Sequence, residues 1–122
     1  MATRAKMTGD RGEAIAVEYL RRHGFLICAR NWRCGRYEID IVAVKSGVTH
    51  FVEVRTRAAD SVVPPEMTIT PAKAGAMLRA AEAYLAMTRT AGEAEFDLVA
   101  VEICPDGSYE VRYVANAVEV GW

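Results

Sequence analysis

At 122 residues the chain has the length of a single domain, and with 52% apolar and 25% charged residues it has the composition of a soluble globular protein. No stretch approaches the ~20 apolar residues that a membrane-spanning helix needs, and no apolar segment follows the basic residues at the N-terminus as in a secretory signal. The net charge of −1 excludes strong overall attraction to nucleic acid, yet residues 1–36 carry a net charge of +5 and the remainder −6. This basic N-terminal third is compatible with a local anion-binding surface.

The chain is predicted to fold as one domain over residues 8–122, behind a flexible tail at residues 1–7, because no repeat, low-complexity tract or long linker divides it. Its three cysteines, Cys28, Cys34 and Cys104, do not follow the spacing of zinc ligands. An odd number of cysteines without an export signal is typical of reduced, buried thiols, the alternatives being a disulfide or metal ligands, so we expect a cytoplasmic protein.

A first helix is predicted over residues 8–23. Thr8 or Asp10 can cap its N-terminus, and Gly24 is the kind of residue that ends a helix. Its apolar residues recur at helical spacing and form the stripe Ala16, Val17 and Leu20. Glu13 precedes the first two residues of that stripe by three and four positions, which places its carboxylate in line with the buried face.

Three strands are predicted to follow this helix. "FLICAR" at residues 25–30 is short, "YEIDIVAVK" at 37–45 is rich in Ile and Val, and "VTHFVEVRTR" at 48–57 returns antiparallel. The "SG" between the last two strands, at 46–47, suits a two-residue hairpin turn. Residues 58–69 contain a Pro-Pro pair that cannot sit inside a sheet, so they are predicted to form a loop.

A second helix is predicted to begin at Pro71, with Thr70 as its cap, and to end near Arg89. Its buried stripe is predicted to be Met77, Leu78, Ala81, Tyr84 and Leu85. Two more strands follow, at residues 95–103 and 109–114. The element order α-β-β-β-α-β-β indicates a mixed sheet flanked by two helices, of α/β or α+β class.

The predicted hairpin brings charged residues together. With a two-residue turn, the register places Asp40 directly opposite Glu53 and Glu38 opposite Arg55, and the two members of each pair point to the same face. The other, core-facing side is predicted to be Ile39, Ile41, Val52 and Val54. A slip by one residue would turn this apolar side to solvent, so the register is well specified.

The pairing of Asp40 with Glu53 suggests a bound cation. Like charges placed directly opposite one another destabilise a hairpin, whereas a divalent cation between them removes the repulsion. Mg²⁺ is a hard ion that prefers carboxylate oxygens and supports chemistry on phosphates. Arg55 and Arg57 on the same face could hold a phosphate. The alternative is that the register differs by two residues, or that both acids simply face water.

Several short motifs in order along the chain carry a resemblance to a known family. They are "GEAIAVEYLRRHGF", "EIDIVA", "HFVEVRTR", "ITPAKAGAMLRAAEAYL" and "EFDLVAVEI". With these motifs, residues 9–118 resemble the YraN-type bacterial proteins, which are assigned to the PD-(D/E)XK nuclease superfamily. That superfamily includes restriction endonucleases and archaeal Holliday junction resolvases. The resemblance therefore implies a restriction-endonuclease-like mixed β-sheet flanked by α-helices.

The resemblance also implies a metal-dependent phosphodiesterase site. Its helix carboxylate falls on Glu13, its strand aspartate on Asp40, and the two charged positions of the ExK motif on Glu53 and Arg55. The backbone carbonyl of Val54 completes the metal shell in many such sites, and the expected cofactor is Mg²⁺ or Mn²⁺. The basic residue Lys73, in the first turn of the second helix, also matches a position of the family, and we expect it to bind nucleic acid with Arg55 and Arg57; the alternative is a solvated lysine.

Three positions depart from the family pattern. Tyr37 stands where the family has Gly, Glu95 where a basic residue is common, and Arg55 where the ExK motif has Lys. Arginine can stabilise negative charge, but its guanidinium stays protonated and cannot serve as a neutral base. Arg55 is therefore expected to weaken hydrolysis without abolishing it.

Three functions are consistent with these observations. The first is a metal-dependent endonuclease-fold protein that binds, and slowly hydrolyses, structured or branched DNA or RNA. The second is a nucleic-acid-binding module that does not cut, and the third is a protein-interaction domain with vestigial acids. Related resolvases are dimers, so a homodimer is one expectation, but no apolar stripe in the sequence is unmistakably an interface.

Overall fold

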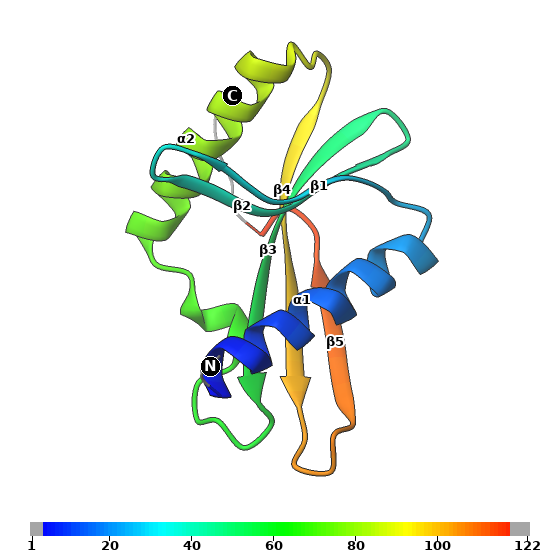
Figure 1. Cartoon of the computed structure of the whole chain (residues 1–122), viewed down its shortest axis with the longest axis vertical. Helices are drawn as coiled ribbons and strands as arrows, with labels where there is room; N and C mark the ends of the chain where they lie inside the picture. The colour runs from blue at the N-terminus through cyan, green and yellow to red at the C-terminus, as the bar shows by residue number, and fades with distance from the viewer. Residues whose placement is uncertain (1–3, 118–122) are drawn as a thin grey trace.

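The computed structural model of the chain describes residues 4–117, with side chains described from Gly9 onward (Figure 1). In chain order the elements are α1 (Arg4–Arg22), β1 (Leu26–Cys34), β2 (Tyr37–Lys45), β3 (Val48–Ala58), the short 3-10 helix η1 (Pro65–Thr68), α2 (Pro71–Thr88), β4 (Ala94–Ile103) and β5 (Tyr109–Val114). The predicted element order is confirmed, with η1 added inside the predicted loop.

The five strands form one mixed sheet in the order β1-β2-β3-β4-β5. Neighbouring strands are antiparallel except β3 and β4, which are parallel. A parallel pair needs a long crossover connection, and α2 lies in that connection. The predicted α/β class is therefore confirmed, and the arrangement is consistent with a restriction-endonuclease-like fold.

The two helices cover opposite faces of the sheet (Figure 1). Helix α1 packs through its predicted stripe, Ala16, Val17 and Leu20, all of which are buried. Helix α2 packs on the other face, where Met77, Ala80, Ala81 and Tyr84 are buried and Leu78 and Leu85 are partly buried. Within residues 4–117, neither helix is long and apolar enough to cross a membrane.

The predicted start of the first helix was wrong. Helix α1 begins at Arg4, so residues 4–7, predicted as part of a tail, are helical, and Thr8 and Asp10 lie inside the helix rather than at its cap. The sequence of residues 4–7 is Arg-Ala-Lys-Met, all good helix formers, so nothing in it favours a break before Thr8.

Strand β1 is longer than predicted, because it continues past residue 30 to Cys34 and pairs with β2 as far as Cys34 opposite Tyr37. Trp32, on this extension, packs edge-on against Tyr84 of α2, with ring centroids 5.3 Å apart. Partial burial of that aromatic ring favours extended structure over the irregular loop that was expected. The prediction of buried thiols was wrong, because Cys28 on this strand is exposed and Cys34 and Cys104 are only partly buried.

The predicted register of the β2–β3 hairpin is confirmed from Lys45 opposite Val48 to Ile41 opposite Val52. Both turn residues have positive φ, 52° at Ser46 and 78° at Gly47, as a tight hairpin turn requires.

The ladder ends at Ile41, so the pairs predicted beyond it do not form. The carboxylate of Asp40 instead accepts a hydrogen bond from the backbone N–H of Val54 at 2.9 Å. Glu38 lies opposite Arg33 of β1, and its carboxylate pairs with that guanidinium at 3.3 Å rather than with Arg55.

Because the ladder ends at Ile41, the four residues predicted to share one apolar face of the hairpin do not all lie on the same face. Ile41 and Val52 belong to the cluster under α1, and Val54 packs against it, but Ile39 belongs to the cluster under α2. Residues two apart in a regular strand share a face, so β2 changes face between Ile39 and Ile41. The side chain of Asp40 is at the point where this change occurs.

Candidate metal and phosphate site

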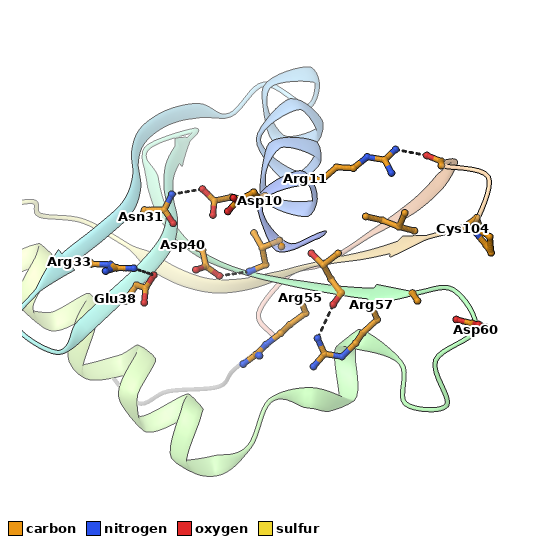
Figure 2. A pocket seen from close by; sticks show the side chains of 18 residues that line it. Asp10, Arg11, Asn31, Arg33, Glu38, Asp40, Arg55, Arg57, Asp60 and Cys104 are labelled. Carbon is orange, nitrogen blue, oxygen red and sulfur yellow. Dashed lines mark hydrogen bonds and ion pairs between the residues drawn. The ribbon is translucent and has the colours of Figure 1, made fainter. Parts of the chain in front are cut away.

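An open pocket of about 1140 Å³ lies at the end of the sheet where β3 and β4 finish (Figure 2). Its walls come from α1, the β1–β2 hairpin, the last part of β3 and the turn after β4. The charged residues that line it are Asp10, Arg11, Glu13, Arg33, Glu38, Asp40, Arg55, Arg57 and Asp60. Of the predicted site residues, Glu13, Asp40, Val54, Arg55 and Arg57 line this pocket.

Glu53, on β3, does not line the open pocket. Its side chain lines a separate, small cavity together with Asp40 of β2 and Met77 of α2. It is 7% exposed, and its Oε2 atom is buried without a hydrogen-bond partner. The cations closest to that oxygen are Lys73 Nζ at 3.2 Å and an Arg55 guanidinium nitrogen at 3.7 Å. A buried carboxylate oxygen that lacks a hydrogen bond is costly, so it is a ready ligand for a further cation.

The pKa of Glu53 is raised to about 8, mainly by burial. A hydrogen bond with Asp40 and the negative charge of Asp40 raise this pKa further, while Lys73 and Arg55 lower it. The two carboxyl groups are therefore close enough to hydrogen-bond, although the predicted ladder pair of Asp40 with Glu53 does not form.

Glu13 approaches the same site from α1. Its carboxylate accepts a hydrogen bond from the Asn31 side chain at 2.7 Å and lies 3.6 Å from the Arg30 guanidinium. Burial raises the pKa of Glu13; the Asn31 hydrogen bond opposes that shift, and the nearby charge of Asp40 adds to it. The carboxylates of Glu13 and Asp40 are thus close enough for the charge of one to affect the other.

The sequence reasoning missed Asn31. Its backbone has a φ of +51°, a conformation that Asn adopts more readily than most residues, and this lies within β1 at a site predicted to be a loop. An asparagine between two strand-forming segments was the available signal, but its partner lies 18 positions away on α1.

Close packing at Gly12 brings α1 down onto the sheet. A Cβ atom at this position would lie 1.9 Å from Oγ1 of Thr56 on β3, so only glycine allows the observed approach. Since Glu13 is the next residue, a shift of α1 at this contact would move the Glu13 carboxylate relative to Asp40.

The predicted phosphate-binding cations lie around the carboxylates. Figure 2 shows Arg55 and Arg57 extending from β3 to the side away from α1, with Asp40 above them. The Nε atom of Arg55 is buried without a hydrogen-bond partner, whereas Arg57 donates to the carbonyl of Thr56 at 2.8 Å. Arg55 therefore keeps an unused donor beside the pocket.

Lys73 is held in the first turn of α2, where Thr70 caps the helix as predicted. The hydroxyl of Thr70 accepts a hydrogen bond from the backbone N–H of Lys73 at 3.1 Å, and Pro71 occupies the first turn. The side chain of Lys73 reaches Glu53 rather than lying free in solvent.

The donor set at Asp40 and Glu53 fits a hard divalent ion, because it offers carboxylate oxygens and one of them lacks a hydrogen bond. The donor atoms of Glu13, Asp40 and Glu53 do not all lie within 4.8 Å of one another, so these three side chains do not form one compact ligand group. Among the side chains described from Gly9 to residue 117, the three donors that do meet that distance are His50, Glu95 and Asp97, at a different place.

Comparison with known proteins places the chain among bacterial relatives. The model of "Uncharacterised protein family UPF0102" matches residues 12–101. A UPF0102 protein of Bacteroides fragilis is 36% identical over 111 residues, which cover 91% of each chain. A UPF0102 protein of Geobacter metallireducens is 35% identical over 123 residues, with both chains covered in full, and one of Chlorobium phaeobacteroides is 41% identical over 102 residues, covering 83% of this chain and 80% of the relative.

Proposed function

The chain belongs to the uncharacterised protein family UPF0102, and we propose that it is a metal-dependent phosphodiesterase that acts on structured or branched nucleic acid in the cytoplasm. The observation that carries this proposal is the buried Glu53 carboxylate, which has one oxygen without a hydrogen bond and lies against Asp40. Ionising both carboxyl groups in this buried place is costly, and the raised pKa of Glu53 reflects that cost. A divalent ion bound between them would offset it. The resemblance to the PD-(D/E)XK superfamily supports the same function.

Asp40 and Glu53 would hold Mg²⁺ or Mn²⁺, together with the backbone carbonyl of Val54. Bound there, such an ion polarises a phosphoryl oxygen and makes a coordinated water more acidic. Glu13, steadied by Asn31, would orient the attacking water or take its proton at the α1 side of the pocket. These are the chemical roles that the geometry permits for the three carboxylates.

The cations on the α2 side would hold the nucleic acid. Arg55 lines the pocket with its guanidinium charge, which suits a phosphate oxygen, and Arg57 lies two residues along the same strand. Lys73 is close enough to Glu53 to stabilise charge on a phosphate at the same place. The open shape of the pocket suits a polymer that continues past it rather than an enclosed small molecule.

The test is a cleavage panel of branched, flapped, single-stranded and duplex substrates, as DNA and as RNA, with Mg²⁺ and with Mn²⁺. Wild type is compared with Asp40→Asn and with Asp60→Asn, an exposed acid at the pocket edge. We expect cleavage of at least one substrate, lost in Asp40→Asn and kept in Asp60→Asn. Cleavage of no substrate, or equal cleavage by both variants, rejects the proposal.

A binding module that does not cut is the second candidate, and one observation favours it. Lys73 and Arg55 both lie within ion-pair distance of Glu53, so the carboxylate is partly neutralised without a metal. This candidate predicts salt-sensitive binding to DNA or RNA that Asp40→Asn leaves unchanged or slightly strengthens. A protein with no affinity for either nucleic acid at low salt would instead fit a protein-interaction domain.

A homodimer is also proposed, because a dimer would present two such pockets to a branched substrate. Sedimentation equilibrium of the full chain with and without a four-way junction measures this directly. A monomer under both conditions would contradict it.

A further inference from the structure

A second group of potential ligands lies at the other end of the sheet. The arrowheads of β3 and β4 in Figure 1 mark the end that forms the pocket, whereas His50 of β3 and Glu95 and Asp97 of β4 lie near the starts of these two parallel strands. The imidazole and the two carboxylates each offer one atom, and all three atoms lie within 4.8 Å of one another. Neither the metal chemistry nor the phosphate binding proposed for the pocket uses these residues.

The two carboxylates converge on one atom of the imidazole. His50 Nδ1 lies 2.5 Å from Oδ2 of Asp97 and 3.5 Å from Oε2 of Glu95. A ring nitrogen carries either one proton or one lone pair, so it can satisfy one carboxylate oxygen and not two. Asp97 holds that nitrogen at the shorter distance, and Glu95 is left with the longer contact and with solvent. A cation shared by the three side chains would give each carboxylate a direct partner.

Asp97 is oriented by groups that do not belong to the trio. The side chain is fully buried, its Oδ1 accepts the backbone N–H of Asn116 at 3.1 Å, and its Oδ2 accepts the hydroxyl of Tyr113 on β5. Outer donors of this kind fix the direction of a metal-binding carboxylate in known sites. The ring of Phe25 covers His50 edge-on, with ring centroids 5.0 Å apart, and limits the freedom of the imidazole.

We propose that His50, Glu95 and Asp97 bind one divalent cation of the Zn²⁺ type. One imidazole nitrogen with two carboxylate oxygens is a mixed donor set that suits Zn²⁺ better than Mg²⁺, with water as a fourth ligand. Ligand atoms around tetrahedral zinc stand about 3.3 Å apart, given bonds of about 2.0 Å. The distance from His50 Nδ1 to Glu95 Oε2 is already close to this value. The distance from His50 Nδ1 to Asp97 Oδ2 would have to increase by less than about 1 Å.

The site has a route for the ion and a structural consequence. Glu95 is one third exposed while His50 and Asp97 are buried, so an ion would enter past Glu95. Once bound, it would join β3 to β4 at the point where β4 begins after the α2 crossover. Binding to the folded chain alone raises its stability, so Zn²⁺ would raise the melting temperature.

The test is a titration of the full, reduced chain with Zn²⁺, followed by calorimetry and by the ¹⁵N resonances of its two histidine rings. We expect Zn²⁺ binding that shifts the His50 Nδ1 resonance and leaves His23 unchanged, and that accounts for one ion per chain in Asp40→Asn, where the pocket lacks its aspartate. Zn²⁺ bound only by Cys28 or another thiol would leave the His50 resonance in place and would overturn the proposal, as would no binding at all.

Two variants and two matched controls complete the test. His50→Gln and Glu95→Gln should each weaken Zn²⁺ binding at least tenfold, whereas His23→Gln and Glu93→Gln, at exposed positions, should not. Glu95→Gln changes a partly exposed side chain, so it remains informative if His50→Gln fails to fold. Undiminished binding in Glu95→Gln overturns the proposal. Asp40→Asn should bind Zn²⁺ at His50 as wild type does, so the outcome is independent of the pocket.

Discussion

Lys73 Nζ, in the first turn of α2, lies 3.2 Å from the Oε2 atom of Glu53 on β3. The ammonium group of Lys73 is therefore a cation already within ion-pair distance of the oxygen that a divalent ion would bind. Two cations at one carboxylate repel each other, and the repulsion is strong in a site with little water. We therefore expect Lys73 to weaken the binding of a metal ion and to strengthen the binding of a phosphate. Because these two effects have opposite signs, they can be measured separately.

Lys73→Gln is expected to strengthen Mn²⁺ binding several-fold and to weaken nucleic-acid binding, because it removes a charge that competes with the metal and attracts phosphate. Calorimetry measures the first effect and fluorescence anisotropy at varied salt the second. Arg79→Gln, an exposed cation on the same helix, is the matched control. A loss of Mn²⁺ binding in Lys73→Gln would show that Lys73 supports the metal site instead.

Arg55→Lys is expected to increase the rate of metal-dependent cleavage about tenfold, a part of the roughly 10²–10⁴-fold that a positioned acid or base contributes. Lysine can release its proton and reorient its ammonium group, while the guanidinium remains a fixed cation. Single-turnover cleavage with Mn²⁺ measures the effect, with Arg57→Lys as the control from the same strand. An unchanged or lower rate would mean that the arginine is not the cause of slow hydrolysis.

The stability of the metal-free protein should fall as pH rises through about 8, because the pKa of Glu53 is raised in the folded state. A raised carboxyl pKa contributes stability that is fully present below the unfolded value of about 4.5 and lost as pH rises through the folded value. Glu53→Gln removes this dependence and should be more stable than wild type at pH 9, by on the order of 3 kcal/mol.

Urea unfolding at pH 5, 7 and 9 in the presence of a chelator measures this difference. Glu82→Gln, at an exposed position of α2, should follow wild type at every pH. Addition of Mn²⁺ at pH 9 should stabilise wild type and leave Glu53→Gln unchanged. If the free energy of unfolding depends on pH in the same way for wild type and Glu53→Gln, then the pKa of Glu53 is not raised in the folded protein.

Local patterns in the sequence predicted most of the fold. The Ser-Gly turn set the β2–β3 register, and the Thr70 cap and the apolar stripes located the two helices, because each of these depends on residues close in sequence. The same patterns predicted that Asp40 and Glu53 meet. They did not predict the change of face at Asp40, because a side chain that captures a backbone N–H leaves no periodic signal.

Relationships between distant segments account for what the sequence reasoning missed. Asn31 reaches Glu13 across the α1–β1 connection, and His50 meets Asp97 only because β3 and β4 pair in parallel in one particular register. Apolar strands buried on both faces do not specify such a register by their pattern. A histidine and an aspartate 47 residues apart therefore gave no indication of a shared site.

The close contact between Gly12 and Thr56 yields the final prediction. Gly12→Ala introduces a Cβ atom that would lie 1.9 Å from Thr56 Oγ1 and 2.9 Å from Thr56 Cβ, so α1 must move away from β3. We expect a loss of about 1–3 kcal/mol in stability, as for other overpacked positions. Cleavage should also slow, because Glu13 moves with the helix.

The same helix offers a matched control, since a Cβ atom at Gly9 has no neighbour within 4 Å. Gly9→Ala should be neutral or stabilising by about 0.5–1 kcal/mol, because alanine favours helix. Gly12→Ala combined with Thr56→Ala removes the colliding hydroxyl and methyl groups and should recover part of the stability and part of the cleavage rate. If Gly12→Ala is as stable and as active as Gly9→Ala, then the approach of α1 to β3 does not position Glu13.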